Sequence, residues 1–292
     1  MENKLKYVLA ATGDFEINGK MTDDFKLFIQ KLKAQKIKVD FCTKNQIKEW
    51  LKKEKINASQ VVAIAATDEF LEAANQFGMT VLAYFNPQIK GQTYKKAMIL
   101  VEGFEELDAN FMERMYLRKH HIPWKIIETK RTYIREITLD DLPALFQMYG
   151  HKGITDYIEP LKKVEEEKEY TKAYIEHQYW FYGYGMWVVF QKENNQLIGR
   201  AGLENREVEK ESLLEMGYAI DTDYQRQGYA LEVCLAIIEY AKECLEFETL
   251  NCFVEEKNIA SIALLEKLLF EKANEVLMDG KKMLRFQKSL VK

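Results

Sequence analysis

Short apolar runs alternate with amphipathic stretches through the first 125 residues of the chain. Four of the runs have the length and composition of buried strands, and a fifth suits an edge strand. The runs cover residues 7–11, 39–42, 61–65, 80–84 and 97–101, and the amphipathic stretches cover residues 25–35, 47–53 and 69–77. Strands that alternate with helices form a parallel sheet with helices on both faces. The pattern therefore predicts a doubly wound, Rossmann-like α/β domain over residues 1–125.

A different pattern, an apolar strand followed by a turn and an apolar helix, occupies residues 215–244. Gly228 and Ala230 keep large side chains out of the turn, so the backbone there can approach a ligand closely. The first N–H groups of the following helix have no partner within the helix and carry partial positive charge, which suits a phosphate. The segment predicts a pyrophosphate-binding loop, with a plain turn before a core helix as the alternative.

Gln225, Gly228 and Ala230 stand at the spacing of the acetyl-CoA-binding motif (Q/R)-x-x-G-x-(G/A), and the loop resembles that of the GNAT acetyltransferases. The resemblance extends over about residues 129–292 and includes Asn258-x-x-Ser261, which opens a segment similar to the family's closing helix. The branch most resembled acetylates the N-termini of ribosomal proteins. The resemblance implies a GNAT domain with a mixed α+β sheet at residues 131–292, after a linker at residues 126–130.

The resemblance also implies acetyl-CoA as co-substrate and a primary amine as acceptor, with no metal ion. The residues that it places against acetyl-CoA lie on a strand, the loop and the starts of two helices: Tyr218, Ala219, Ile220, Gln225, Arg226, Gln227, Gly228, Tyr229, Ala230, Asn258 and Ser261. A backbone N–H near Ala219 or Ile220 is expected to polarise the thioester carbonyl, as oxyanion donors do.

Two positions depart from the family pattern. Many members carry a Tyr seven residues after the Asn, where it protonates the departing thiolate, and this chain has Leu265. We expect Ser261 near the sulfur instead, although a helix-surface hydroxyl bonded to its own backbone is an equal alternative. The second departure is Leu269, where the family usually has Gly, and it affects the helix end more than the chemistry.

Direct attack on the thioester requires a neutral amine. Near pH 7 roughly a tenth of an α-amine is neutral, against fewer than about one lysine in a thousand, so an enzyme without a conspicuous base copes better with an α-amine. Glu204 and Glu215 are the candidates for a base or a water relay. The simpler interpretation of each is a solvent-facing carboxylate at a strand end. The aromatic segment 179–184 either packs on the sheet or lines the acceptor pocket.

The N-terminal half resembles the haloacid-dehalogenase-like (HAD-like) phosphatase fold in its Val61-Val62-Ala63-Ile64-Ala65-Ala66 strand and the Ala-Ala helix that follows. Aligning Gly13 on the glycine of the family's first motif puts Ala10 at the nucleophile, and Ala66 falls at an acidic metal ligand. An alanine can neither attack phosphorus nor hold Mg²⁺. The resemblance therefore implies a phosphatase-like domain without phosphatase activity, unless Asp14 and Asp68 form a shifted site.

Composition adds few constraints. The chain has 292 residues, 47% of them hydrophobic, and its 42 basic and 46 acidic residues give a net charge of −4, which does not favour nucleic acid. No transmembrane run or signal peptide is apparent, so we expect a cytoplasmic protein without a membrane partner. The four cysteines and four histidines lack metal-ligand spacing. The sequence leaves the oligomeric state open.

Three functions are consistent with these patterns. The favoured one is an acetyl-CoA-dependent N-acetyltransferase acting on a protein N-terminus or a small amine. A non-catalytic acyl-CoA-binding regulator is the second, because Leu265 and the lack of an obvious base weaken the case for catalysis. The third is a bifunctional enzyme whose first domain still hydrolyses a phosphate ester.

Overall fold

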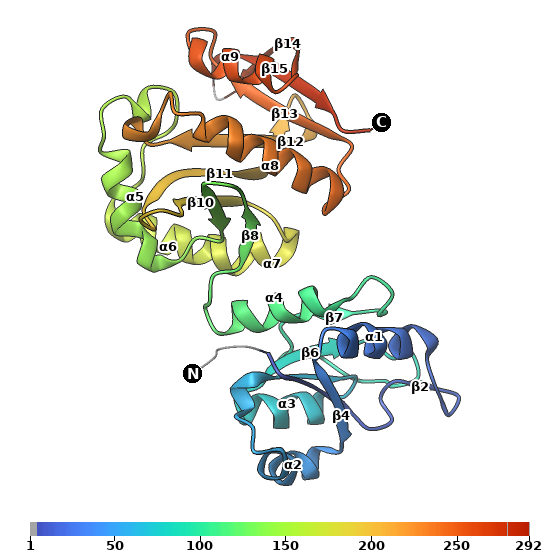
Figure 1. Cartoon of the computed structure of the whole chain (residues 1–292). Coiled ribbons are helices and arrows are strands. Elements are labelled where there is room, and N and C mark those ends of the chain that lie inside the picture. The colour runs from blue at the N-terminus through green and yellow to red at the C-terminus, as the bar shows by residue number, and fades with distance from the viewer. Residues whose placement is uncertain (1–4, 279, 292) are drawn as a thin grey trace. The chain divides into compact units, whose positions relative to one another are not determined.

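The computed structural model describes residues 5–278 and 280–291, and the chain divides into two compact units, Met1–Ile122 and Pro123–Lys292 (Figure 1). Each unit has its own sheet and its own hydrophobic core. Within the described ranges, no helix is both long and apolar enough to cross a membrane.

The N-terminal unit is built on a five-stranded parallel sheet in the order β4-β1-β5-β6-β7. Its elements in chain order are β1 (Tyr7–Ala11), β2 (Glu16–Ile17), β3 (Lys20–Met21), α1 (Asp23–Ala34), β4 (Lys38–Cys42), η1 (Lys44–Gln46), α2 (Ile47–Glu54), η2 (Ala58–Gln60), β5 (Val61–Ala65), α3 (Asp68–Gln76), β6 (Thr80–Tyr84), β7 (Leu100–Val101) and α4 (Ala109–Lys119). Every residue of β1, β5 and β6 is buried, as in parallel sheets covered on both faces. The predicted parallel sheet is confirmed.

Helices cover this sheet on both faces. Alternate strand residues such as Leu9 and Ala63 pack against Trp50 of α2 and Leu71 of α3. The other face carries a group of stacked and edge-on rings from several elements: Phe15, Phe25, Phe28, Tyr84 and Phe104. The hairpin β2/β3 and helix α4 were not predicted from the sequence.

The C-terminal unit contains an eight-stranded sheet in the order β14-β15-β13-β12-β11-β10-β9-β8. Its elements in chain order are β8 (Lys125–Glu128), β9 (Thr132–Arg135), η3 (Leu139–Asp141), α5 (Leu142–Tyr149), η4 (Ile154–Asp156), α6 (Val164–Ala173), the π-helical η5 (Tyr174–Gln178), α7 (Tyr179–Tyr182), β10 (Met186–Gln191), β11 (Leu197–Val208), β12 (Glu211–Ile220), η6 (Thr222–Tyr224), α8 (Tyr229–Glu243), β13 (Thr249–Val254), α9 (Ile259–Lys267), β14 (Glu271–Met278) and β15 (Lys281–Ser289). Neighbouring strands are antiparallel except for β12 and β13, so the predicted mixed sheet is confirmed.

Residues 126–130 differ from the predicted linker. Most of this segment belongs to β8, which pairs antiparallel with β9, and the chain turns between the two strands where Thr129 N donates to Thr132 O. Ile126 and Ile127 pack against the core of the C-terminal unit. Two adjacent isoleucines that gain apolar contacts stabilise an edge strand, and the unit therefore begins at Pro123.

The sheet opens between its two parallel strands. Strands β12 and β13 are matched at one register position, Glu215 with Asn251. Beyond it β12 runs on to Ile220 while β13 ends at Val254, so two strand edges face a gap at the centre of the sheet. The candidate site lies at this gap between β12 and β13.

Candidate functional site

A groove of about 690 Å³ lies where β12 and β13 part. Its walls come from the end of β12, the start of α8, the start of α9 and the loop around η4. Ten of the residues predicted to contact acetyl-CoA line it: Tyr218, Ala219, Ile220, Gln225, Arg226, Gly228, Tyr229, Ala230, Asn258 and Ser261. The eleventh, Gln227, does not line the groove, and its side-chain Nε2 donates to the carbonyl of Asp223.

Helix α8 begins at this groove. Gly228 is its N-cap with φ of +82°, a conformation that costs glycine little, and the Glu232 N–H donates to the Gly228 carbonyl as the first helical bond. The N–H groups before Glu232 have no intrahelical acceptor. Gln225 fixes the approach to the helix by donating from Nε2 to the Ile220 carbonyl at 2.9 Å. The loop therefore presents the positive end of a 15-residue helix to the groove.

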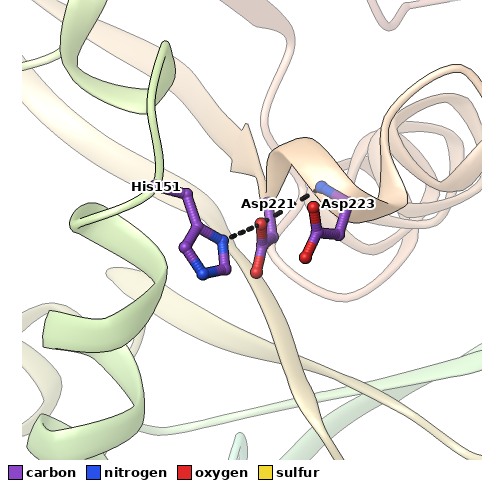
Figure 2. Close-up of side chains that lie close together, drawn as sticks. All are labelled: His151, Asp221 and Asp223. Carbon is purple, nitrogen blue, oxygen red and sulfur yellow. Dashed lines mark hydrogen bonds and ion pairs between the residues drawn. The ribbon is translucent and has the colours of Figure 1, made fainter.

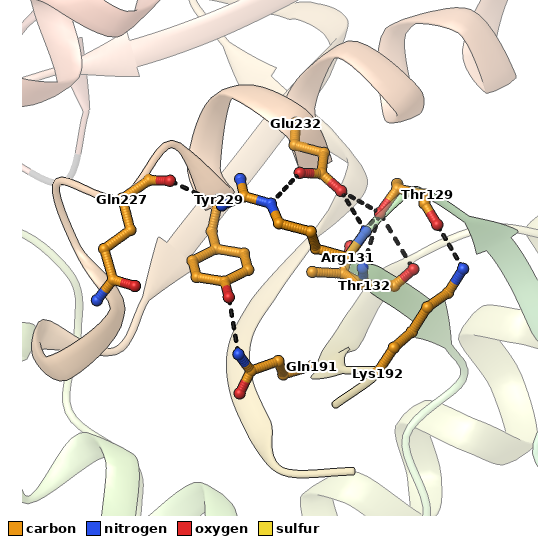
Figure 3. Close-up of polar contacts among 8 residues, drawn as sticks. All are labelled: Thr129, Arg131, Thr132, Gln191, Lys192, Gln227, Tyr229 and Glu232. Carbon is orange, nitrogen blue, oxygen red and sulfur yellow. Dashed lines mark hydrogen bonds and ion pairs between the residues drawn. The ribbon is translucent and has the colours of Figure 1, made fainter. Parts of the chain in front are cut away.

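A hydrogen-bonded network on Arg131 holds this loop from outside the groove (Figure 3). The Arg131 guanidinium donates to Glu232 at 2.7 Å and to the Gln227 carbonyl at 2.9 Å, and it lies 4.1 Å from the centre of the Tyr229 ring. Glu232 also accepts from the Thr129 hydroxyl at 2.6 Å. The sequence did not single out Arg131, because its partners are about a hundred positions away.

The direction of the peptide groups on β12 follows from one hydrogen bond. Asp221 N donates to Ile198 O, on the β11 side. Because successive N–H groups on a strand point to opposite sides, the Ala219 N–H also points toward β11, whereas those of Tyr218 and Ile220 point toward the gap. Of the two positions that the sequence suggested for an oxyanion donor, Ile220 therefore has the suitable orientation.

The hydroxyl groups of Tyr218 and Ser261 lie next to each other in the groove. Asn258 caps α9 by accepting from the Ser261 N–H at 3.1 Å, and the Ser261 Oγ lies 2.7 Å from the hydroxyl of Tyr218 on β12. Burial raises the pKa of Tyr218 above its usual value, so this phenol stays neutral. The Ser261 hydroxyl thus forms its hydrogen bond with another residue of the groove.

The two candidate bases occupy a different place. Glu204 on β11 and Glu215 on β12 are directly paired cross-strand neighbours, and neither lines the groove. Glu204 accepts from the Tyr174 hydroxyl of η5, and Glu215 accepts from the Arg206 guanidinium, each at 2.7 Å. Burial raises the pKa of Glu215, and the nearby Glu204 adds to the effect while Arg206 opposes it. The carboxylates thus lie on the sheet face covered by η5.

Gly202 and Gly217 form the next cross-strand pair on the same face of the sheet as these carboxylates. A β-carbon on Gly202 would meet the Gly185 carbonyl oxygen at 2.1 Å, so a side chain there is excluded without movement of β10. The pair leaves the sheet without side chains between the carboxylates and the end of β12.

Residues 151–158, which we call the strap, border the groove and are tied down at both ends. At one end, His151 Nδ1 and Asp221 Oδ1 lie 2.7 Å apart (Figure 2). At the other, the Tyr157 hydroxyl donates to the Lys257 carbonyl, next to the cap of α9. Asp221 raises the pKa of His151 through this hydrogen bond and through its charge, and Asp223 adds to the effect.

His151, Asp221 and Asp223 bring potential metal-ligand atoms within 4.8 Å of one another, which the spacing of histidines in the sequence did not suggest. Asp221 Oδ1 already accepts from the Asp223 N–H as well as facing His151. Hydrogen bonds of the cluster therefore join the strap to the segment that leads to α8. We call the bond between His151 and Asp221 the latch.

Two further positions singled out in the sequence, Leu265 and Leu269, are structural. Leu265 is fully buried in the core, and Leu269 takes φ of +61° in a Schellman-type helix end, where Phe270 N donates to Leu265 O. Within the aromatic segment Tyr179 is buried and Phe181 is 81% exposed, so the segment has members in both environments.

In the N-terminal unit, the two aspartates discussed for a shifted site accept hydrogen bonds from nearby loops. Asp14 accepts from the Ala66 N–H at 2.7 Å and from the Thr67 hydroxyl, and burial raises its pKa. Asp68 accepts from Thr93 and Tyr94; burial opposes these bonds, but they outweigh it and lower its pKa.

Comparison with known proteins bears on the C-terminal unit. Residues 131–271 match the family model described as "Acetyltransferase (GNAT) domain". The chain is 28% identical over 154 residues to the "Uncharacterized N-acetyltransferase YoaA" of Bacillus subtilis, covering 50% of this chain and 83% of that protein. It is 26% identical over 150 residues to the "Uncharacterized N-acetyltransferase p20" of Bacillus licheniformis, covering 49% and 81%.

Among solved structures, a ribosomal-protein-S5-alanine acetyltransferase from Vibrio fischeri aligns with a TM-score of 0.48 and 18% identity, over 56% of this chain and 95% of that one. The family match itself rests on sequence, and it spans strands β9 to β13 with α8 and α9 between and after them. Residues 131–271 therefore form a GNAT acetyltransferase domain.

Proposed function

We propose that the C-terminal unit transfers the acetyl group of acetyl-CoA to a primary amine, either a protein N-terminus or a small amine. The observation that carries the proposal is the groove between the parted strands, which leads to the start of α8. Its phosphate end is the α8 N-terminus, where backbone N–H groups and the helix dipole attract the pyrophosphate. The thioester end is the gap, where Ile220, Tyr218 and Ser261 meet.

The proposed reaction is a direct attack. The neutral amine forms a C–N bond to the thioester carbon, and the carbonyl oxygen takes up negative charge that the Ile220 N–H stabilises. The C–S bond then breaks with its electron pair on sulfur, and the thiolate takes a proton from water. No bond to the protein forms at any step.

The acceptor is proposed to arrive on the sheet face that carries Glu204 and Glu215. Because burial raises the pKa of Glu215, this carboxylate is a stronger base than an ordinary glutamate once it is ionised. It removes the surplus proton of the attacking amine directly or through water. An α-amine, of which roughly a tenth is neutral near pH 7, makes the smallest demand on such a base.

One observation favours a second candidate, an acyl-CoA-binding regulator. Neither carboxylate belongs to the lining of the groove in the described part of the chain. Under this alternative acetyl-CoA binds as proposed, and no amine releases its thiol.

The N-terminal unit is proposed to act as a HAD-like scaffold or ligand-binding module without phosphatase activity. The support is that Ala10 and Ala66 stand at the positions where the chemistry needs carboxylates, and that Asp14 and Asp68 are hydrogen-bonded to the unit's own loops. Mg²⁺-dependent release of phosphate from a generic ester, lost on changing Asp14, would instead support the bifunctional enzyme.

Calorimetric titration of acetyl-CoA, followed by a thiol-release assay with a panel of peptides and small amines, tests the proposal. In the variant Gly228→Glu, a carboxylate enters the anion site and φ of +82° becomes strained, so we expect binding at least 100-fold weaker than in the wild type. Gly280→Glu is the matched control, because Gly280 also has positive φ with open space around it and lies outside the groove lining.

The outcomes separate the candidates. Binding lost in Gly228→Glu alone, with amine-dependent thiol release by the wild type, supports the acetyltransferase. Binding without release from any amine favours the regulator. A wild type that does not bind acetyl-CoA contradicts both.

A further inference from the structure

Four tyrosines line the groove, and three of them direct their hydroxyl groups elsewhere. The Tyr157 hydroxyl donates to the Lys257 carbonyl, and that of Tyr224 donates to the side chain of Gln196. The Tyr229 hydroxyl accepts from Gln191. Tyr218 differs, because its hydroxyl pairs with Ser261, which also lines the groove. Of these four phenols, only that of Tyr218 is paired within the groove.

Neighbouring elements fix both members of this pair. Tyr218 stands two residues before Ile220, on the strand edge that faces the gap. Ser261 is held at the first turn of α9, where its own N–H donates to the cap residue Asn258. The 2.7 Å bond thus joins β12 to the first turn of α9.

Either hydroxyl can be the donor in this bond, and the protonation state of Tyr218 allows it to take that role. Burial raises the pKa of this phenol, so it is neutral throughout the working range and has one proton to donate. When it donates to Ser261 Oγ, the serine proton is free to point into the groove. A hydroxyl that accepts one hydrogen bond donates a stronger one, because the two bonds polarise each other.

We propose that Tyr218 is a positioning residue for departure of the thiol: it donates to Ser261, and the Ser261 hydroxyl then donates to the sulfur of the bound thioester. The inference rests on the proposed acetyltransferase function and specifies one part of it. The hydroxyl pair transfers no proton. It stabilises the electron pair that the sulfur gains as the C–S bond breaks, and water later supplies the proton.

The pKa of the thiol in bound CoA tests the inference without an acceptor. A hydrogen bond to the thiolate favours the ionised form, so we expect the thiol of CoA bound to the wild type to titrate about one unit below an ordinary thiol, whose pKa is about 8.5. The thiolate absorbance of the complex, with that of the protein alone subtracted, reports this titration. In Tyr218→Phe and in Ser261→Ala we expect the shift to be lost.

Tyr133→Phe is the matched control, because it removes a phenol hydroxyl that donates to Asn195, and both of these residues lie outside the groove lining. It should titrate like the wild type. Ser261→Ala, at a partly exposed helix position, carries the test if Tyr218→Phe does not fold. A wild type that does not bind CoA contradicts the acetyltransferase proposal itself. A bound thiol with an ordinary pKa, or a shift that persists in both variants, overturns the role of the hydroxyl pair alone.

Discussion

At the residue scale, the groups proposed for the chemistry divide between two environments. Tyr218 and Ser261 lie in the groove, where the thioester is proposed to bind. Glu204 and Glu215 lie beside one another on the face covered by η5, and each already has a hydrogen-bond partner. The sheet thus separates the groups for the leaving thiol from those for the incoming amine.

This separation predicts that Glu215→Gln slows amine-dependent thiol release by about 100-fold or more while the affinity for acetyl-CoA stays unchanged. Glu204→Gln should have the same pattern if the two carboxylates act together. Because the pKa of Glu215 is raised, the wild-type rate should increase with pH as this carboxyl ionises, and that step should disappear in Glu215→Gln. Calorimetry and a pH series of thiol release check the prediction. A variant with equal losses in affinity and rate would show a structural role.

At the element scale, elements within one short segment could be predicted from the sequence, whereas contacts between distant positions could not. The strand, turn and helix around Gly228 lie within one short segment, so spacing alone indicated a phosphate loop. The contacts that hold the segment join positions far apart: Arg131 with Glu232 across 101 positions, and His151 with Asp221 across 70. No hydrophobic period encodes such pairs. The predicted linker failed for a related reason, since a short strand is defined by the partner that it finds in β9.

We expect the strap to make the affinity for acetyl-CoA depend on pH. Its latch raises the pKa of His151, so the ion pair contributes fully below the ordinary histidine value of about 6.5 and is lost as pH rises through the higher folded value. We expect the affinity for acetyl-CoA to fall a few-fold over that range.

His151→Gln keeps a hydrogen-bond donor to Asp221 without a titrating ring. Its affinity should follow only the ionisation of acetyl-CoA, which is common to both proteins. Calorimetric titrations between pH 5.5 and 8.5, from about one unit below the ordinary histidine value to about two units above it, measure the difference. Parallel curves for the two proteins would exclude the latch as a pH-dependent element.

At the scale of the whole molecule, the described lining of the groove belongs entirely to the C-terminal unit. We therefore predict that a fragment of residues 123–292 folds and binds acetyl-CoA as tightly as the full chain does. A fragment of residues 131–292 lacks β8 and the Thr129 bond to Glu232. It should be less stable by about 2 kcal/mol, the order expected for two partly buried isoleucines.

Urea denaturation of the two fragments, with calorimetry of acetyl-CoA on each, measures both expectations. Equal stability of the fragments would mean that β8 contributes little to the unit. Binding by the full chain alone would show that the groove depends on the N-terminal unit.

The outer strand β14 has a consequence for solubility. Six of its eight residues are exposed, among them Glu271, Lys272 and Glu275. An edge strand with unpaired peptide groups invites other strands to add to it, and charges along the edge oppose this because they would have to be buried against a second chain. The sheet thus ends in a sequence that resists strand-to-strand aggregation, even though interior strands such as β10 and β13 are largely buried.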